Sequence, residues 1–137
     1  MPLISRMTGA SSTADGLRLG RRRFNILVGR ALRRLPGPIR DRLSNVAIIV
    51  EEEPTAEQLA EAGLSPGDTL YGLYTGIPLT ERTSAYGMVL PDRITIFRRP
   101  LLELCSTEAE LMEEVRHTVL HEIGHHFGLS EQDLEDY

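Results

Sequence analysis

Residues 107–128 constrain the fold most, because they predict one long amphipathic helix with a defined start and end. Thr107 and Glu110 have the spacing of an N-terminal capping box, and Gly128 supplies a helix stop. At about 3.6 residues per turn, the apolar side chains fall on one half of the helix. They are Leu111, Met112, Val115, Val119, Ile123 and Phe127. A helix with such a face packs against a core, so we expect it at the centre of the fold.

A second stripe of the same helix carries histidines, within the sequence HEIGHHFG. His121 and His125 stand one turn apart, so both imidazoles can reach one ion at the ~2.0–2.1 Å typical of zinc. Glu122 points about 100° away from His121, which suits a general base acting on metal-activated water better than a ligand. The spacing therefore predicts a catalytic zinc site. The alternative is a helix that carries two exposed histidines by chance.

The two other histidines of this helix have different predicted roles. His117 shares the stripe one turn before His121, where we expect an exposed side chain. Lining a cleft, or replacing a weak third ligand, are the alternatives for His117. His126 lies by angle on the apolar face, and we expect it to be a core histidine or one that supports the site, not a ligand.

The third ligand of this site must come from the tail or from upstream, because only 12 residues follow His125. Gly128 can adopt a positive φ and so turn the chain back toward the ion. The acidic candidates in the tail are Glu131, Asp133, Glu135 and Asp136. The spacing from Gly128 favours Glu131, and Asp133 is the second choice.

Upstream of this helix, the patterns predict short helices and strands within one domain. Residues 1–23 lack periodicity and are expected to form a flexible tail, followed by a single domain over residues 24–137. Residues 24–35 have apolar side chains at helical spacing, and the following Pro-Gly-Pro sequence ends that helix. The other expected elements are a helical turn over 39–43, strands over 46–50, 69–76 and 93–99, and a small helix between Thr55 and Gly63 with a capping box from Thr55 and Gln58.

The connection between the last two strands is long, with Pro78, Gly87 and Pro91. A connection of this length is typical of functional loops, and also of plain irregular structure. The sequence leaves both possibilities open.

Length, hydropathy and charge limit the functional classes. A chain of 137 residues suits one domain, and no apolar run approaches the roughly 18–20 residues that span a bilayer. The start of the chain also lacks the apolar stretch of a secretory signal, so we expect a cytoplasmic protein. All 15 basic residues are arginine: residues 1–50 hold ten of them and two acids, and the remaining residues hold five arginines and 18 acids. This asymmetry is typical of a nucleic-acid arm or of two oppositely charged faces of one domain, and we favour the second.

Several side chains outside the histidine stripe are further candidates. The lone Cys105 is expected to be a small buried residue and not a reactive thiol. Arg98 and Arg99 are expected to be solvated or to pair with the acidic start of the last helix, the alternative being contact with a substrate carboxylate or an oxyanion. Tyr71, Tyr74 and Tyr86 are candidates for a hydrogen bond to a transition state, and their spacing does not choose between them.

The segment TVLHEIGHHFGLSEQD, together with GIPLTERT and LPDRITIFRRPL, resembles the small bacterial proteins called minimal zincins or zincin-like metallopeptidases. The resemblance covers residues 24–137 and implies an α+β fold, in which a small mixed sheet packs against helices and the last long helix carries the motif. It implies zinc ligands at His121 and His125 and a catalytic glutamate at Glu122. The acidic third ligand of the family, often aspartate, matches Glu131, and its glycine matches Gly128.

The function that these residues predict is zinc-dependent hydrolysis of peptide bonds in a peptide or protein substrate. An extended substrate would pair along a sheet edge, at the strand near 93–98 or at the chain near Gly87. One alternative is a zincin-like module that binds metal or another protein without hydrolysis. The other is a nucleic-acid binder that uses GRRRF and the first helix, which we disfavour because no aromatic platform accompanies the charges. We expect no membrane partner, and the sequence does not define an oligomeric state.

Overall fold

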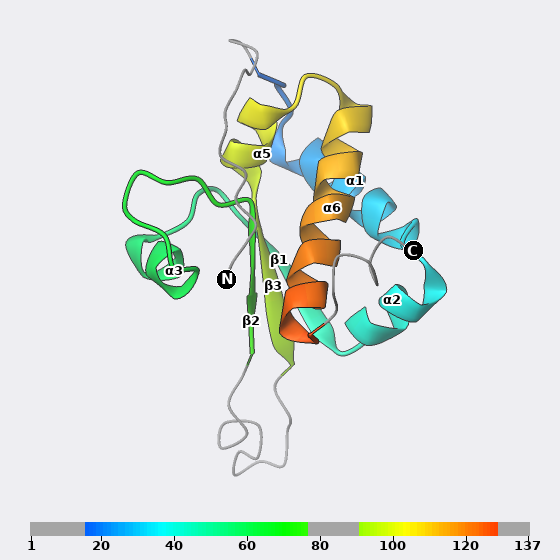
Figure 1. Ribbon diagram of the computed structural model, residues 1–137. Coiled ribbons are helices and arrows are strands. Elements are labelled where there is room, and N and C mark those ends of the chain that lie inside the picture. Colours follow the sequence, from blue (N-terminus) through cyan, green and yellow to red (C-terminus); the bar gives the residue numbers. More distant parts are fainter. Residues whose placement is uncertain (1–15, 77–90, 129–137) are drawn as a thin grey trace, which may run out of the picture.

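The structure is a computed structural model that describes residues 16–76 and 91–128 (Figure 1). Its elements in chain order are α1 (Arg21–Arg33), α2 (Gly37–Leu43), β1 (Val46–Glu51), α3 (Ala56–Glu61), β2 (Gly72–Thr75), β3 (Asp92–Phe97), α5 (Arg98–Leu104) and α6 (Glu108–His126). Figure 1 shows α6 running along the sheet, with α1 and α2 on one side and α3 on the other. In the part of the chain that the structure describes, no helix combines the length and the apolar character needed to cross a membrane.

The three strands form a mixed sheet in the order β1-β3-β2. β1 runs parallel to β3, whereas β2 runs antiparallel to it. The predicted α+β fold with a small mixed sheet is therefore confirmed. The central position of β3 also corrects a prediction, because a strand that is bonded on both sides cannot pair with a substrate. Residues near Gly87, the other predicted place for pairing, lie outside the described residues.

Each face of the sheet has its own core, because side chains alternate along the strands. Ile94 and Ile96 of β3 face α1 and α6, whereas Phe97 packs with Leu59 of α3 on the other face. The main core joins two helices through Phe24, Leu27, Val28 and Ala31 of α1 and Leu111, Val115, Val119 and Ile123 of α6. The predicted apolar face of α6 is thus largely buried. Phe127 is the exception at 41% exposed, because it lies beyond the last helical residue.

The start of α6 is held by side-chain caps. Thr107 Oγ1 accepts a hydrogen bond from the Glu110 amide at 3.1 Å, as predicted. The Glu110 carboxylate instead accepts from the Ser106 amide at 2.7 Å, so it caps one residue earlier than the expected box. The capping box between Thr55 and Gln58 is complete in both directions. These caps satisfy amides that have no partner within the helix.

The chain is ordered ahead of the position where the first helix was predicted to begin. α1 begins at Arg21 rather than at Phe24. Arg23 donates two hydrogen bonds to Glu108, at 2.7 and 3.0 Å, and so connects the start of α1 to the start of α6. This pair raises the pKa of Arg23 and lowers the pKa of Glu108, in each case chiefly through their hydrogen bond.

The third predicted strand is shorter than expected, because β3 ends at Phe97 and α5 follows at once. Pro100 lies in the first turn of α5, where a missing amide proton costs no helical hydrogen bond. The alternating pattern over 93–99, which predicted one strand, therefore covers the end of a strand and the start of a helix. Arg98 donates to Glu52 at 2.7 Å and to the Leu19 carbonyl at 2.6 Å. Its acidic partner is thus at the end of β1 and not at the start of the last helix.

Gly72 allows α6 to approach β2 closely, so a larger side chain at this position should clash with α6. A Cβ atom at Gly72 would lie 2.5 Å from Thr118 Cγ2, and Thr118 is 3% exposed. We expect Gly72→Ala to lower the free energy of unfolding in urea by about 1–3 kcal/mol. Adding Thr118→Ser, which removes that methyl group, should restore part of the loss.

Gly29→Ala is the matched control, since this glycine lies within α1 and its Cβ would meet only the end of the Arg33 side chain, at 3.4 Å. We expect that change to raise stability by about 0.5–1 kcal/mol. Equal effects of the two substitutions would contradict the close approach at Gly72.

The prediction that Cys105 is buried is confirmed, at 1% exposed. Burial, with smaller contributions from the charges of Glu114 and Glu110, raises the pKa of its thiol to about 12. The native protein should therefore not react with a thiol reagent such as 5,5′-dithiobis(2-nitrobenzoate) at pH 8, and should bind one equivalent once unfolded. Rapid labelling of the native protein would show that the thiol is accessible.

Candidate active site

The HExxH segment lies in the last turns of α6, where its side chains divide between two environments. Glu122 is buried at 7% exposed, whereas His121 is half-buried and His125 is exposed. The difference follows from helix geometry, because Glu122 is rotated from the histidine stripe toward β2. The helix thus presents a pair of imidazoles outward and a carboxyl group inward.

Glu122 is held by the backbone of β2. Its Oε1 accepts a hydrogen bond from the Tyr74 amide at 2.6 Å. Burial raises the pKa of the Glu122 carboxyl to about 7, although the bond from Tyr74 acts in the opposite direction. A carboxyl group with such a pKa exchanges protons near neutral pH, as a general base requires.

Tyr74 also connects this carboxyl group to further side chains that the sequence analysis did not assemble. Its hydroxyl donates to Asp92 Oδ2 at 2.7 Å. The His126 ring stacks on the Tyr74 ring, with 3.9 Å between centroids and 19° between planes. His126 Nε2 also lies 3.8 Å from Asp92 Oδ2. Of the two predicted roles for His126, that of a core group is wrong, because its side chain is 38% exposed, whereas it does contact the tyrosine that holds Glu122.

Asp92 is the residue of this group that carried no sequence signal, because it was considered part of a long connection. The alternation of side chains along the strand could have indicated Asp92. Asp92 precedes Ile94 by two positions and so shares its face, and Ile94 pairs with Tyr74 across the sheet. Register between strands that are distant in the sequence is needed to make this inference.

The histidine stripe extends one turn before the motif. The rings of His117 and His121 lie 4.2 Å apart between centroids at 37°, and His117 is exposed as predicted. Partial desolvation, together with neighbouring positive charge that includes His126, lowers the pKa of His125. A neutral imidazole is the form that binds metal ions.

Phe127 lies at the end of the helix against aromatic and cationic groups. Its ring makes edge contacts with Tyr74 and His126, with centroid distances of 6.3 and 5.0 Å. The Arg42 guanidinium of α2 lies 4.8 Å from the Phe127 centroid. The next residue, Gly128, has φ +74°, the left-handed conformation that was predicted to turn the chain.

Comparison with known proteins relates the sequence of this chain to a known family. The model of the zincin-like metallopeptidase family matches residues 43–137. The chain belongs to the zincin-like metallopeptidase family. Among solved structures, this zincin-like chain is similar to a conserved hypothetical protein from Thermo thermophilus, with 27% identity and a TM-score of 0.52, over 80% of this chain and 94% of that one. No curated protein matches it.

The third ligand predicted for this zincin-like chain lies outside the described residues, as do Asp133 and Tyr86. Within residues 16–76 and 91–128, no three His, Cys, Asp or Glu side chains lie together as a metal-binding group. Of the other tyrosines considered, Tyr71 is buried in the main core, and Tyr74 contacts the motif directly. Tyr74 is thus the described tyrosine beside Glu122.

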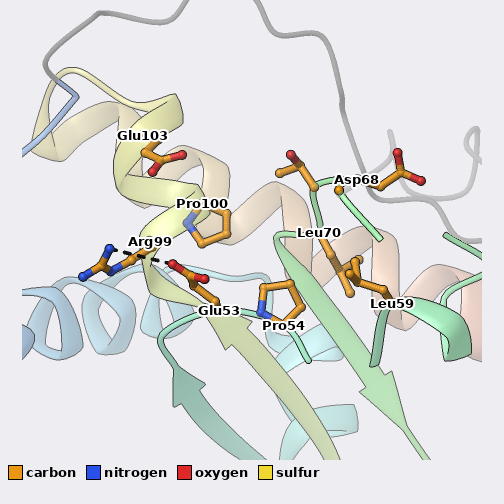
Figure 2. A pocket seen from close by; sticks show the side chains of 10 residues that line it. Glu53, Pro54, Leu59, Asp68, Leu70, Arg99, Pro100 and Glu103 are labelled. Atoms are coloured by element: carbon orange, nitrogen blue, oxygen red, sulfur yellow. Dashed lines mark ion pairs between the residues drawn. The ribbon is translucent and has the colours of Figure 1, made fainter. Parts of the chain in front are cut away.

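A separate hollow of about 340 Å³ lies at the opposite end of the sheet (Figure 2). Glu53 and Pro54, which follow β1, and Arg99 and Pro100 of α5 line it. The motif instead adjoins Asp92, where β3 begins, so the two features lie at different ends of that strand. Figure 2 shows Arg99 directed to Glu53, with 3.7 Å between their charged atoms. Arg99 therefore lies away from the motif and does not serve the role of an oxyanion contact there.

Proposed function

We propose that this chain is a zinc-dependent metallopeptidase that hydrolyses peptide bonds, with Glu122 as the general base. The observation that carries the proposal is the position of Glu122, buried at 7% exposed and bonded to the Tyr74 amide beside a stripe of histidines. A buried carboxyl group is destabilising unless its environment compensates for the loss of water. A carboxyl group at this position, beside two potential metal ligands, is explained by chemistry better than by packing.

The donor set fits zinc in type and in spacing. His121 and His125 are one turn apart on the outward stripe, and the lowered pKa of His125 favours the neutral ring. Glu131 is the proposed third ligand, because the positive φ at Gly128 redirects the chain just before it. When bound, zinc would supply Lewis acidity toward a water molecule and a substrate carbonyl group.

Glu122 would accept a proton from the attacking water and then donate it to the leaving amine. Its pKa of about 7 suits both transfers, because a group that titrates near the working pH can act as base and then as acid. The Tyr74 amide holds Oε1, which leaves the other carboxyl oxygen for the proton.

The outer edge of β2 is the proposed place for an extended substrate. Leu73 pairs with Thr95 and the Tyr71 carbonyl accepts from the Phe97 amide, so the backbone groups of Gly72 and Tyr74 are directed away from β3. The Tyr74 amide on that side already reaches Glu122. A peptide added along this edge would lie beside the base, in the manner of β-augmentation.

Metal binding is the first test. Purified protein incubated with zinc and then desalted should retain about one equivalent by elemental analysis. His121→Ala and His125→Ala should each lose stoichiometric zinc, since each removes one donor. His117→Ala is the matched control, because it changes the same stripe one turn earlier and should retain the metal.

The third donor is tested by the pair Glu131→Gln and Asp133→Asn. We expect the first to weaken zinc binding and the second to leave it unchanged. The opposite pattern would assign Asp133 as the ligand. A wild-type protein that retains no zinc would contradict the metal site altogether.

Hydrolysis is the second test, with cleavage of a broad peptide library followed by mass spectrometry. Glu122→Gln should keep the zinc and reduce kcat by roughly 10²–10⁴-fold or more, because the amide can still accept the Tyr74 bond but cannot take a proton. Glu113→Gln is the control, an exposed glutamate of the same helix that pairs with Arg116. Zinc uptake with no cleavage by wild-type protein would instead favour a metal-binding interaction module.

A further inference from the structure

We propose that Asp92 is a positioning residue for Glu122, acting through Tyr74, so that the start of β3 fixes the carboxyl group of the motif. The inference rests on the proposed function in assigning Glu122 a catalytic task. The contacts that connect these residues stand independently of that assignment.

The first step concerns β2, which is short and outermost in the described sheet. It spans Gly72–Thr75 and pairs with β3 on one side. A strand held along one edge opens locally more easily than a central one. The Tyr74 amide, which holds Glu122, therefore needs a further restraint if the carboxyl group is to keep one position.

The second step is that the Tyr74 side chain supplies this restraint. Tyr74 pairs with Ile94 of β3, while its hydroxyl reaches Asp92 two residues earlier on the same strand and face, at 2.7 Å. Asp92 in turn pairs with Val46 of β1. The bond is thus diagonal and connects the outer strand to a residue that is itself held by the far strand. A hydrogen bond to a carboxylate that is 15% exposed is stronger than one between neutral groups.

The third step adds the helix. His126 lies one turn after Glu122 and stacks on the Tyr74 ring at 3.9 Å. A Cβ atom at Gly76 would lie 3.5 Å from the His126 ring and 3.8 Å from Asp92 Oδ1, so the end of β2 passes close to both. Tyr74 is therefore fixed by β3 through its hydroxyl and by α6 through its ring and its amide. Removing the Asp92 contact would release the first of these restraints.

The fourth step is the consequence for catalysis. Proton transfer requires the carboxyl oxygen at a defined distance from the reacting water, whereas substrate binding along the strand edge does not depend on that oxygen. Loss of the restraint should lower kcat by a larger factor than it raises KM, because β2 still pairs with β3, and should leave zinc content unchanged. If Asp92 had a merely structural role, its replacement would lower stability without a separate effect on kcat.

The experiment uses Asp92→Ala, Tyr74→Phe and the double variant in the full chain. Both single changes remove the same hydrogen bond, and Tyr74→Phe does so with the aromatic ring kept. Hydrogen exchange and the chemical shift of the amide at position 74, measured by NMR, report directly on its bond to Glu122. We expect roughly tenfold faster exchange in each single variant and little further change in the double variant.

Asp41→Ala is the matched control, because this aspartate is also charged but is exposed and lies on α2, outside the sheet. It should change neither the exchange at position 74 nor the kinetics. With a cleaved peptide in hand, Asp92→Ala should lower kcat about tenfold with a smaller rise in KM, and the double variant should be no slower.

The outcomes separate this inference from the proposed function. Unchanged exchange at position 74 in both single variants overturns the inference, whatever the activity. Faster exchange in a protein that cleaves no peptide supports the connection from Asp92 to Glu122 and overturns the proposed function instead. Cleavage by wild-type protein with an unchanged kcat in Asp92→Ala overturns the positioning role and leaves the proposed function in place.

Discussion

The close approach of α6 to β2 is the constraint on which the rest of the site depends. It requires a glycine at position 72, because Thr118 occupies the space that a side chain would take. One turn further along α6, the same proximity brings the Glu122 carboxyl group within 2.6 Å of the Tyr74 amide. Core packing and the arrangement of the Glu122 carboxyl group are therefore consequences of a single helix-to-strand contact.

This contact also explains how a carboxyl group can be buried in so small a domain. Among the described residues, Glu122 has no cationic side chain as an ion-pair partner, and its amide partner only partly offsets the lost hydration, which is why its pKa rises to about 7. The fold would be more stable with an apolar residue there. Departures from local stability rules are concentrated at functional sites, where they are compensated elsewhere. Here the compensation comes from the main core, which includes Val115, Val119 and Ile123 of the same helix.

Local patterns in the sequence predicted the elements well where one periodicity was uninterrupted. The apolar stripe and caps of α6, the strand β1 and the complete box at Thr55 were of this kind. The predicted strand over 93–99 was wrong from Arg98 onward, because the helix α5 follows β3 without a turn signal in the sequence. Pro100 gave no such signal, since proline is compatible with the first turn of a helix. The histidine pair and Glu122 followed from helical spacing alone. Asp92 could not be found in this way, since its contact with Tyr74 depends on strand register and not on any local pattern.

The parallel pairing of β1 with β3 determines which charges can take part in the site. Because both strands end at the same side of the sheet, Glu52 and Glu53 meet Arg98 and Arg99 there, while the start of β3 is left to Asp92. Arg21 joins the same acidic group, at 3.0 Å from Glu52, and Arg23 pairs with Glu108 at the start of α6. Arg21 and Arg23 of the basic first part of the chain thus pair with glutamates away from the motif. In the described residues, Glu122 accepts from the Tyr74 amide, and the Tyr74 side chain in turn contacts Asp92 and His126. These contacts can orient a proton acceptor without an arginine that would hold it in its charged form.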